Sequence, residues 1–309
     1  MAGVIAIGEC MAELSLTSPE GRVAGAAVGY AGDTYNTAVY LRRLGLEVAY
    51  ASAVGAGDPF SAGILQALAD EGVGRDLVVE AEGRLPGLYA IQRDERGERS
   101  FFFWRSEAPA RDYFKLADLK ALGAAMDAAD LIVVSAISLA VIGEAGRGTL
   151  GELLARAKAA GAAVAFDTNY RARLWPGPDV GRAAIEAVLP HCRYLSLSAE
   201  DVAAFGGRSA EAMARAWAAR GVEVVLRHGD HRIEVLSGEG AELFPPDPAA
   251  ERVTDTTGAG DSFNAGYWAT RLRGGSPAEG VAAGRRLAAA VVQHPGAIIP
   301  KAAMPRLEA

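Results

Sequence analysis

The chain has 309 residues, of which 50% are hydrophobic and 22% are charged, so it can bury a large core without disulfides. Its formal net charge is −7 and it has no run of lysine or arginine, which argues against nucleic acid as a partner. The two cysteines form no metal-binding pattern, and we find neither a secretory leader nor a membrane-spanning segment in the sequence. We therefore expect a cytoplasmic protein that does not enter membranes.

Short apolar runs alternate with longer amphipathic segments along the chain. The runs are typical of strands buried on both faces and cover residues 3–8, 47–54, 130–135, 162–167, 194–198 and 222–227. Helices that end just before a glycine are predicted at residues 36–44, 58–71 and 149–160. This order of elements predicts one α/β domain over residues 1–309 with a mostly parallel central sheet.

Residues 85–105 do not fit this alternation. Two strand-like runs, residues 88–92 and 100–105, flank the turn-rich stretch 94–98. Strand-like runs on either side of a short turn-rich stretch are typical of an antiparallel hairpin. We therefore expect a small β element that stands apart from the parallel sheet and covers a ligand as a lid.

Side chains of a strand point alternately to its two faces. In the second run of the hairpin, Phe101, Phe103 and Arg105 share one face, and Phe102 and Trp104 share the other. A hairpin that is apolar on both faces has to cover something on each of them. We expect one face to turn toward a ligand and the other toward a second subunit, so that the protein forms a homo-oligomer through the lid.

The most informative motif is DTTGAGDSFNAG, which begins a predicted helix near the C-terminus. Its glycines allow the N–H groups of Gly258, Ala259 and Gly260 to point in one direction and form an anion site. Asp261 adds negative charge to this site, which is explained if the carboxylate accepts the proton of an attacking hydroxyl. The short motif Gly-Ala-Gly-Asp alone is also compatible with a capped helix, and residues 55–58 repeat it.

The full motif resembles the C-terminal signature of the ribokinase-like, or PfkB, sugar kinases. The resemblance implies an α/β/α sandwich with a lid formed by about residues 11–31 and 85–108, ATP and Mg²⁺ as cofactors, and Asp261 as the catalytic base. The sequence has no Walker-A Gly-Lys-Ser/Thr motif, and neither Gly-Ala-Gly continues to the Gly-x-Gly-x-x-Gly fingerprint of a nicotinamide-dependent oxidoreductase. A non-catalytic sugar-acid sensor on the same fold remains an alternative.

Two groups of polar residues suit a sugar substrate. Asp33 and Asn36 lie three residues apart at a predicted helix start, where a carboxylate and an amide on one face can bind a polyol or cap the helix. Arg171 follows a buried strand, and Arg105 lies on the hairpin. Taken singly, each arginine is compatible with a solvated surface position. Together they predict an anionic substrate, because a guanidinium group binds a carboxylate through two hydrogen bonds.

Seven segments are similar to the 2-keto-3-deoxygluconate kinases within this family. The segments are GECMAELS, AGDTYNTAVYLRRLG, RLPGLYAI, GERSFFFWRSEAPA, DTNYRARLW, DTTGAGDSF and GAIIPKAAMP. The resemblance implies transfer of the ATP γ-phosphate to the 6-hydroxyl of 2-keto-3-deoxygluconate. A kinase for a neutral sugar such as fructose, ribose or tagatose is the main alternative. The substrate-binding residues implied are Gly32, Asp33, Asn36, Tyr89, Phe103, Arg105, Asn169 and Arg171.

The chain departs from the family pattern at three places. Phe103 stands where the family has a tyrosine, so one hydroxyl that can contact the substrate is missing. The nucleotide strand ends in Arg-His-Gly instead of Lys-x-Gly, and the family's Asn-x-x-Glu motif becomes Ser-Ala-Glu-Asp. By correspondence, the expected nucleotide-binding residues are Ser198, Arg227, Gly229, Gly258 and Gly260, and Asp201 is the expected Mg²⁺ ligand.

Overall fold

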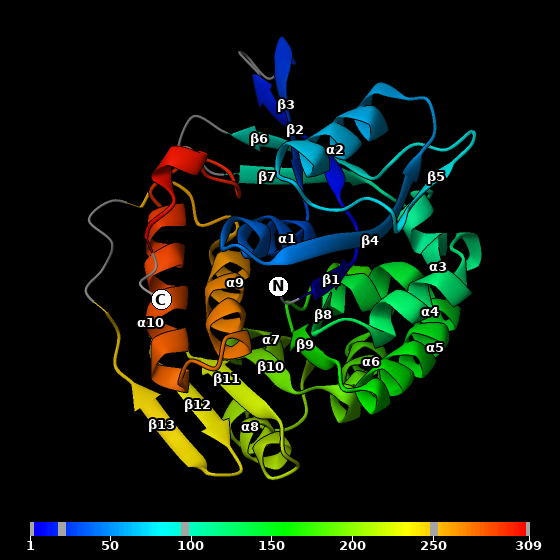
Figure 1. Cartoon of the computed structure of the whole chain (residues 1–309). Helices are drawn as coiled ribbons and strands as arrows, with labels where there is room; N and C mark the ends of the chain where they lie inside the picture. The colour runs from blue at the N-terminus through cyan, green and yellow to red at the C-terminus, as the bar shows by residue number, and fades with distance from the viewer. Residues whose placement is uncertain (1–2, 18–22, 94–98, 248–252, 307–309) are drawn as a thin grey trace.

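The predicted apolar runs form the centre of a large sheet in the computed structural model, which describes residues 3–17, 23–93, 99–247 and 253–306 (Figure 1). The described part of this sheet has nine strands in the order β13-β12-β11-β10-β9-β8-β1-β4-β5. Neighbouring strands are parallel from β5 to β11, and β12 and β13 are antiparallel additions at one edge. The strands are β1 (Gly3–Ile7), β4 (Glu47–Gly55), β5 (Val78–Ala81), β8 (Leu131–Ser135), β9 (Ala163–Asp167), β10 (Tyr194–Ser198), β11 (Glu223–Arg227), β12 (Ile233–Ser237) and β13 (Gly240–Phe244).

Helices cover both faces of this sheet, so its central strands are apolar on both sides. In β8, Ile132 and Val134 join one hydrophobic core, whereas Leu131 and Val133 join the other. The first core includes residues from α3 (Tyr113–Leu116), α4 (Leu119–Asp127), α5 (Ala136–Ala160), α6 (Pro178–Val188), α7 (Ala199–Phe205) and α8 (Ala210–Ala218). The second includes residues from α1 (Asp33–Arg43), α2 (Pro59–Asp70), α9 (Ala259–Leu272) and α10 (Pro277–Val291). The α/β class and the mostly parallel sheet are thus confirmed.

The predicted helices form, with two differences in extent. α2 begins and ends as expected, because Asp58 accepts hydrogen bonds from the N–H groups of Phe60 and Ser61 and Gly72 takes a positive φ of 69°. α1 starts three residues earlier than predicted, at Asp33. α5 starts at Ala136 rather than at residue 149 and is interrupted at Gly143, whose φ is 66°. None of the helices in the described ranges is long and apolar enough to cross a membrane.

A separate four-stranded sheet lies at the top of Figure 1. Its order is β3-β2-β6-β7, with β6 and β7 paired antiparallel, so the predicted hairpin is confirmed. Its turn, residues 94–98, lies outside the described residues. Both segments expected to form the lid thus contribute to this sheet. The strands are β2 (Met11–Thr17), β3 (Gly25–Ala31), β6 (Leu88–Arg93) and β7 (Arg99–Trp104).

The side chains of β7 divide between the two faces as the alternation predicts. Phe103 packs against a small core formed by Met11, Ala31, Tyr89 and Ile91. On the opposite face, two large rings are exposed to solvent: 44% of the surface of Phe102 and 60% of that of Trp104. Phe101 shares the face of Phe103 but is itself 41% exposed. The small sheet therefore has one face turned toward the rest of the molecule, covered only in part, and one exposed aromatic face.

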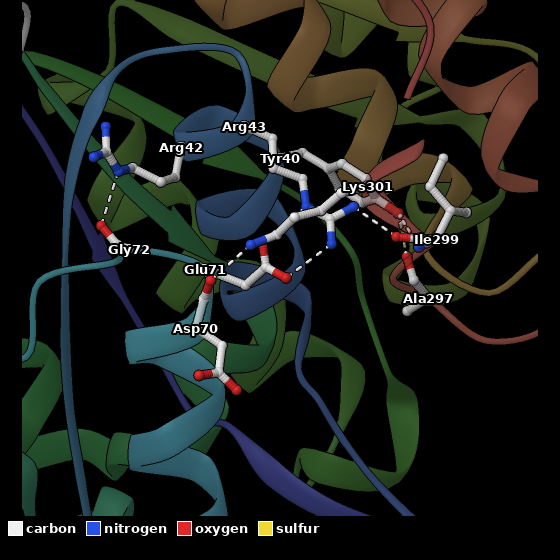
Figure 2. Close-up of polar contacts among 9 residues, drawn as sticks. All are labelled: Tyr40, Arg42, Arg43, Asp70, Glu71, Gly72, Ala297, Ile299 and Lys301. Atoms are coloured by element: carbon white, nitrogen blue, oxygen red, sulfur yellow. Dashed lines mark hydrogen bonds and ion pairs between the residues drawn. The ribbon is translucent and has the colours of Figure 1, made fainter. Parts of the chain in front are cut away.

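The segment that follows α10 is fixed to α1 by buried polar side chains (Figure 2). The hydroxyl of Tyr40 donates to the Ala297 carbonyl at 2.6 Å and accepts from the Ile299 N–H at 3.1 Å. Arg43 donates to both carboxylate oxygens of Glu71, each at 2.8 Å, and to the Ile299 carbonyl at 2.6 Å. Because Tyr40 is fully buried and the Arg43–Glu71 pair is largely buried, this segment has a well-defined position beside α9.

Candidate active site

A cavity of about 890 Å³ lies where β9, β10 and β11 end, below the small sheet. This is the edge of an open parallel sheet at which ligands usually bind. The cavity is also lined by the first residues of α1 and α9 and by aromatic residues of the small sheet. Of the residues selected from the sequence, those that line it are Gly32, Asp33, Asn36, Tyr89, Phe103, Asn169, Arg171, Ser198, Asp201, Arg227, Gly229, Gly258, Gly260 and Asp261.

The glycine loop, residues 256–260, provides an anion site at the start of α9. Gly258 has a φ of 78°, and a Cβ atom there would lie 2.8 Å from the Ala297 carbonyl oxygen, so only glycine fits. Ala259 N–H donates to the Thr256 carbonyl at 3.3 Å. The N–H groups of Gly260 and Asp261 have no acceptor among the described residues, and they point out of the positive end of the helix.

Asp261 lies in the first turn of α9 and is almost fully buried. Its Oδ2 accepts a hydrogen bond of 2.7 Å from the side-chain amide of Asn36, which comes from the facing end of α1. Burial raises the pKa of Asp261 well above its ordinary value, and the nearby charge of Asp33 raises it further. The hydrogen bond from Asn36 and the charge of Arg171 act in the opposite direction. A carboxylate in this setting has a strong tendency to take up a proton.

The start of α1 fits tightly against the loop after β1. A Cβ atom on Gly32 would lie 2.1 Å from the Glu9 carbonyl oxygen, so the chain can only pass here as glycine. Asp33 Oδ2 then accepts a hydrogen bond of 3.1 Å from the side-chain amide of Asn169, which follows β9. Asp33, Asn36 and Asn169 therefore offer hydroxyl-binding groups on two sides of Asp261.

Asp167, the last residue of β9, is a site residue that sequence reasoning did not select. Its carboxylate is buried and accepts hydrogen bonds from Arg227 Nη2 at 3.1 Å and from Asn264 Nδ2 at 2.8 Å. Burial raises the pKa of Asp167 to about 6, although the charge of Arg227 opposes this rise. Its position at the carboxyl end of a buried strand indicates the edge of the sheet where ligands bind. No sequence pattern predicts that Arg227 and Asn264 are its hydrogen-bond partners.

The expected nucleotide-binding residues lie at the ends of β10 and β11. Arg227 reaches the glycine loop, because a Cβ atom on Gly260 would lie 2.8 Å from its Nη1. Asp201 is almost fully buried and accepts a hydrogen bond of 2.8 Å from the Thr168 hydroxyl. Burial raises the pKa of Asp201. Within the described ranges no three His, Cys, Asp or Glu side chains are grouped as metal ligands. Mg²⁺ is commonly held by one or two carboxylates together with phosphate oxygens and water, so Asp201 would need only the phosphates and water beside it.

The arginines on the substrate side of the cavity differ in their partners. Arg171 lines the cavity, and among the described residues its guanidinium group donates only to the neighbouring Tyr170 carbonyl, at 3.1 Å. Arg105 forms an ion pair with the buried Glu9 and does not line the cavity. Arg173, which sequence reasoning did not single out, does line it. The geometry therefore places Arg171 and Arg173 at the cavity wall, and a contact of Arg105 with the substrate stays a prediction.

Arg99 connects the small sheet to the loop that leads into α9. Its Nη1 lies 2.6 Å from Asp255 Oδ1 and 2.9 Å from the Thr257 hydroxyl. Burial alone would raise the pKa of Asp255, but hydrogen bonds from Thr257, Gly296 and Arg99 lower it to about 2. The Asp255 carboxylate therefore stays ionised and holds Arg99 of the small sheet, which is distant from it in sequence.

Residues 1–304 match the sequence profile of the pfkB family carbohydrate kinases. The chain belongs to this family. It is 38% identical to the 2-dehydro-3-deoxygluconokinase of Dickeya dadantii over 307 residues, covering 97% of each chain. It is also 38% identical to the protein of that name from Escherichia coli strain K12 over 310 residues, covering 98% of each. A fructokinase of Klebsiella pneumoniae is 29% identical over 78% of this chain and 76% of its own.

Solved structures of this family confirm the predicted ribokinase-like fold. A PfkB protein of Polaromonas sp. JS666 superposes with a TM-score of 0.82 and 25% identity, covering 95% of this chain and 96% of that protein. A 2-dehydro-3-deoxygluconokinase of Thermotoga maritima gives the same TM-score at 20% identity, covering 96% of this chain and 94% of that one. The mixed sheet with helices on both faces and the added small sheet are therefore family features.

Proposed function

We propose that this protein is an ATP-dependent kinase that phosphorylates the 6-hydroxyl of 2-keto-3-deoxygluconate, also called 2-dehydro-3-deoxygluconate. Relatives with 38% identity over nearly the whole chain carry this name. The observation that carries the proposal is the position of Asp261, a buried carboxylate between unbonded helix N–H groups and a wall with two arginines. These are the groups that phosphoryl transfer to an acidic sugar requires.

In the proposed reaction Asp261 takes the proton of the 6-hydroxyl while that oxygen bonds to the γ-phosphorus and the bond to ADP breaks. The product is the 6-phosphate ester of the sugar acid. Ala259 N–H is already engaged by Thr256, so the N–H groups of Gly260 and Asp261 are the principal donors to the phosphoryl oxygens, and the positive φ of Gly258 sets the turn that leads into the helix. Asn36 keeps the Asp261 carboxylate oriented.

The nucleotide is proposed to bind beside β10 and β11, where Ser198, Arg227 and Gly229 line the cavity. The guanidinium group of Arg227 lies over the glycine loop and can neutralise phosphate charge there. Mg²⁺ arriving with ATP would offset the charge that develops during transfer, and Asp201 is its proposed protein ligand.

The sugar is proposed to bind between the start of α1 and the small sheet. Asp33, Asn36 and Asn169 suit its hydroxyl groups, whereas the rings of Tyr89 and Phe103 cover its apolar surface. The small sheet thereby serves as the lid that excludes water from the reacting groups. Self-association through its exposed aromatic face stays a prediction.

A kinase for a neutral sugar is the alternative, since a fructokinase is among the relatives. Arg171 and Arg173 at the cavity wall favour the acid, because a guanidinium group can donate two hydrogen bonds to a carboxylate and a neutral sugar offers no such charge. The test measures ADP release, with product identification, for 2-keto-3-deoxygluconate, 2-keto-3-deoxygalactonate, fructose, ribose and tagatose. We expect kcat/KM to be at least about 100-fold higher for the acids. Equal values for fructose and the acids would refute the proposal.

A further inference from the structure

Arg173 occupies an unusual position for an exposed arginine. It lies in the 3₁₀ turn Ala172–Leu174, two residues after Arg171, and both side chains line the cavity. Its guanidinium carbon is 3.8 Å from the centroid of the Phe103 ring, which belongs to the small sheet. The side chain therefore spans from the loop after β9 to the underside of the lid, across the region proposed for the sugar.

The ring beneath Arg173 is itself held in place. Phe103 stacks on Tyr89 with centroids 5.6 Å apart and an interplanar angle of 16°. The Tyr89 hydroxyl donates to Glu13 on the neighbouring strand. A guanidinium group that stacks on such a ring uses its flat face, so its five N–H donors point outward in its own plane. Those donors are free to form a two-bonded pair with a carboxylate.

No acidic side chain neutralises this arginine. Arg173 forms neither a hydrogen bond nor an ion pair with any residue in the described ranges. Burial lowers its pKa, and the charges of Arg105 and Arg171 lower it further, so three like charges meet here. Glu9 forms an ion pair with Arg105, and the charge of Arg111 also acts on it. The charge of Arg171 acts on two carboxylates of the cavity, Asp201 and Asp261, and lowers the pKa of both. Arg173 is therefore the cavity-wall arginine that has no carboxylate partner among the described residues.

We propose that Arg173 is a specificity-determining residue that receives the substrate carboxylate together with Arg171, with Phe103 as its stacking platform. The inference rests on the proposed function, because it takes a sugar acid as the substrate. The expected contact of Arg105 with the same carboxylate stays a prediction, because the Arg105 guanidinium group pairs with Glu9. A sugar acid fits because its carboxylate supplies an acceptor for the Arg173 donors, which have none among the described residues.

The test compares Arg173→Gln and Arg173→Lys with the unaltered protein in steady-state assays on 2-keto-3-deoxygluconate and on fructose. For Arg173→Gln we expect KM for the acid to rise about 10- to 100-fold, the range for a lost hydrogen bond to a charged group, with kcat nearly unchanged. Fructose kinetics and KM for ATP should stay within about 3-fold. Arg173→Lys should restore part of the loss, because lysine keeps the charge but not the planar pair of donors.

Arg220→Gln is the matched control, because Arg220 also stacks on a ring, that of Trp217 at 4.5 Å, but does not line the cavity. Titration calorimetry with 2-keto-3-deoxygluconate and no nucleotide provides a second measurement that does not depend on turnover. The proposal is overturned if Arg173→Gln leaves the acid-to-fructose ratio unchanged, or if it lowers kcat for both sugars equally. If the unaltered protein phosphorylates no sugar acid, the proposed function itself fails, which is a separate result.

Discussion

The glycine loop and the arginine loop, residues 170–174, line the same cavity but are held in different ways. The glycine loop packs against Ala297, which is fixed by the buried hydroxyl of Tyr40, and Arg99 ties the preceding residues to the small sheet. The backbone of the arginine loop is held by the buried ring of Tyr170, which packs on Trp175 and Phe205. Its arginine side chains are held by fewer contacts: among the described residues, Arg171 donates only to the Tyr170 carbonyl and Arg173 contacts only the Phe103 ring. The glycine-loop end of the cavity is thus braced by polar side chains of the protein, whereas the arginine side chains at the other end have few partners.

We attribute this difference between the glycine-loop end and the arginine-loop end to their proposed roles in the reaction. Donors that stabilise a transferring phosphoryl group must be aligned before the reaction, since reorganising them during the reaction would add to the barrier. An acidic substrate instead brings a negative charge that can pair with the arginine side chains at the other end of the cavity. Changes at the braced end should therefore alter kcat for every sugar, and changes at the other end should alter KM for acids.

The largest effect is expected for Asp261→Asn, which removes the proposed base at the braced end. We expect kcat to fall by about 100- to 10,000-fold, the range for lost general-base catalysis, while sugar binding measured by calorimetry persists. Asp58→Asn in the second Gly-Ala-Gly-Asp copy is the control, because Asp58 only caps α2 and asparagine caps equally well. Near-normal turnover of Asp261→Asn would remove Asp261 from the mechanism.

The next effect concerns stability at the arginine end. Arg105→Gln leaves the buried Glu9 without its partner, so we expect a loss of about 3–5 kcal/mol in the free energy of unfolding. The double variant Glu9→Gln with Arg105→Gln should recover most of it. Thermal or urea unfolding measures both. If the double variant is stable but shows a higher KM for acids alone, Arg105 contacts the carboxylate and its assignment here has to change.

A smaller effect is expected for Tyr40→Phe, which removes the hydroxyl that fixes Ala297 and Ile299 behind the glycine loop. The Ala297 carbonyl and the Ile299 N–H lose their partner, at a cost of about 1–3 kcal/mol. We expect kcat to fall by the same factor for every sugar, with KM unchanged. Tyr113→Phe is the control, since Tyr113 is a buried tyrosine that donates to Leu77 away from the cavity. Equal losses of kcat in Tyr40→Phe and Tyr113→Phe would mean that the hydrogen bonds of Tyr40 have no special role for the glycine loop.

The smallest effect is a shift in the pH profile. As the proposed base, Asp261 has to be deprotonated before the reaction. Burial together with the charge of Asp33 raises its pKa, so we expect activity to increase as pH rises through that pKa. Asp33→Asn removes one of the charges that raise this pKa and should move the acidic limb of the kcat profile to lower pH. Asp118→Asn at the α4 cap should leave the limb in place. An unchanged limb in Asp33→Asn would show that the two carboxylates are not coupled.

The sequence predicted elements well where one pattern dominated. The bounds of β10, 194–198, agree with the prediction, because this short run lies between polar residues and only small serines interrupt its apolar residues. The first half of α5 was missed, because Gly143, Gly146 and Gly148 weaken the helical signal and only tertiary packing restores it. Helix propensity depends on the local sequence, whereas the formation of α5 depends on its packing against the central sheet.

The sequence predicted candidate site residues where one contiguous motif contains them. It did not predict contacts between residues that are distant along the chain. The glycine loop and Asp261 follow from one contiguous motif. Arg105 and Glu9 are 96 positions apart, so their pairing, which takes Arg105 away from the cavity wall, has no local signal. Arg171 and Arg173 differ by two positions in an irregular turn, for which no periodicity tells which side chain faces inward.

The ion pair between Arg99 and Asp255 joins β7 of the small sheet to the residues that lead into α9. In the proposed reaction, a lid that lifts to admit a sugar would part these two groups and would also release the Thr257 hydroxyl from Arg99. We therefore expect entry of the acceptor and order at the phosphoryl-transfer end to be coupled through Arg99.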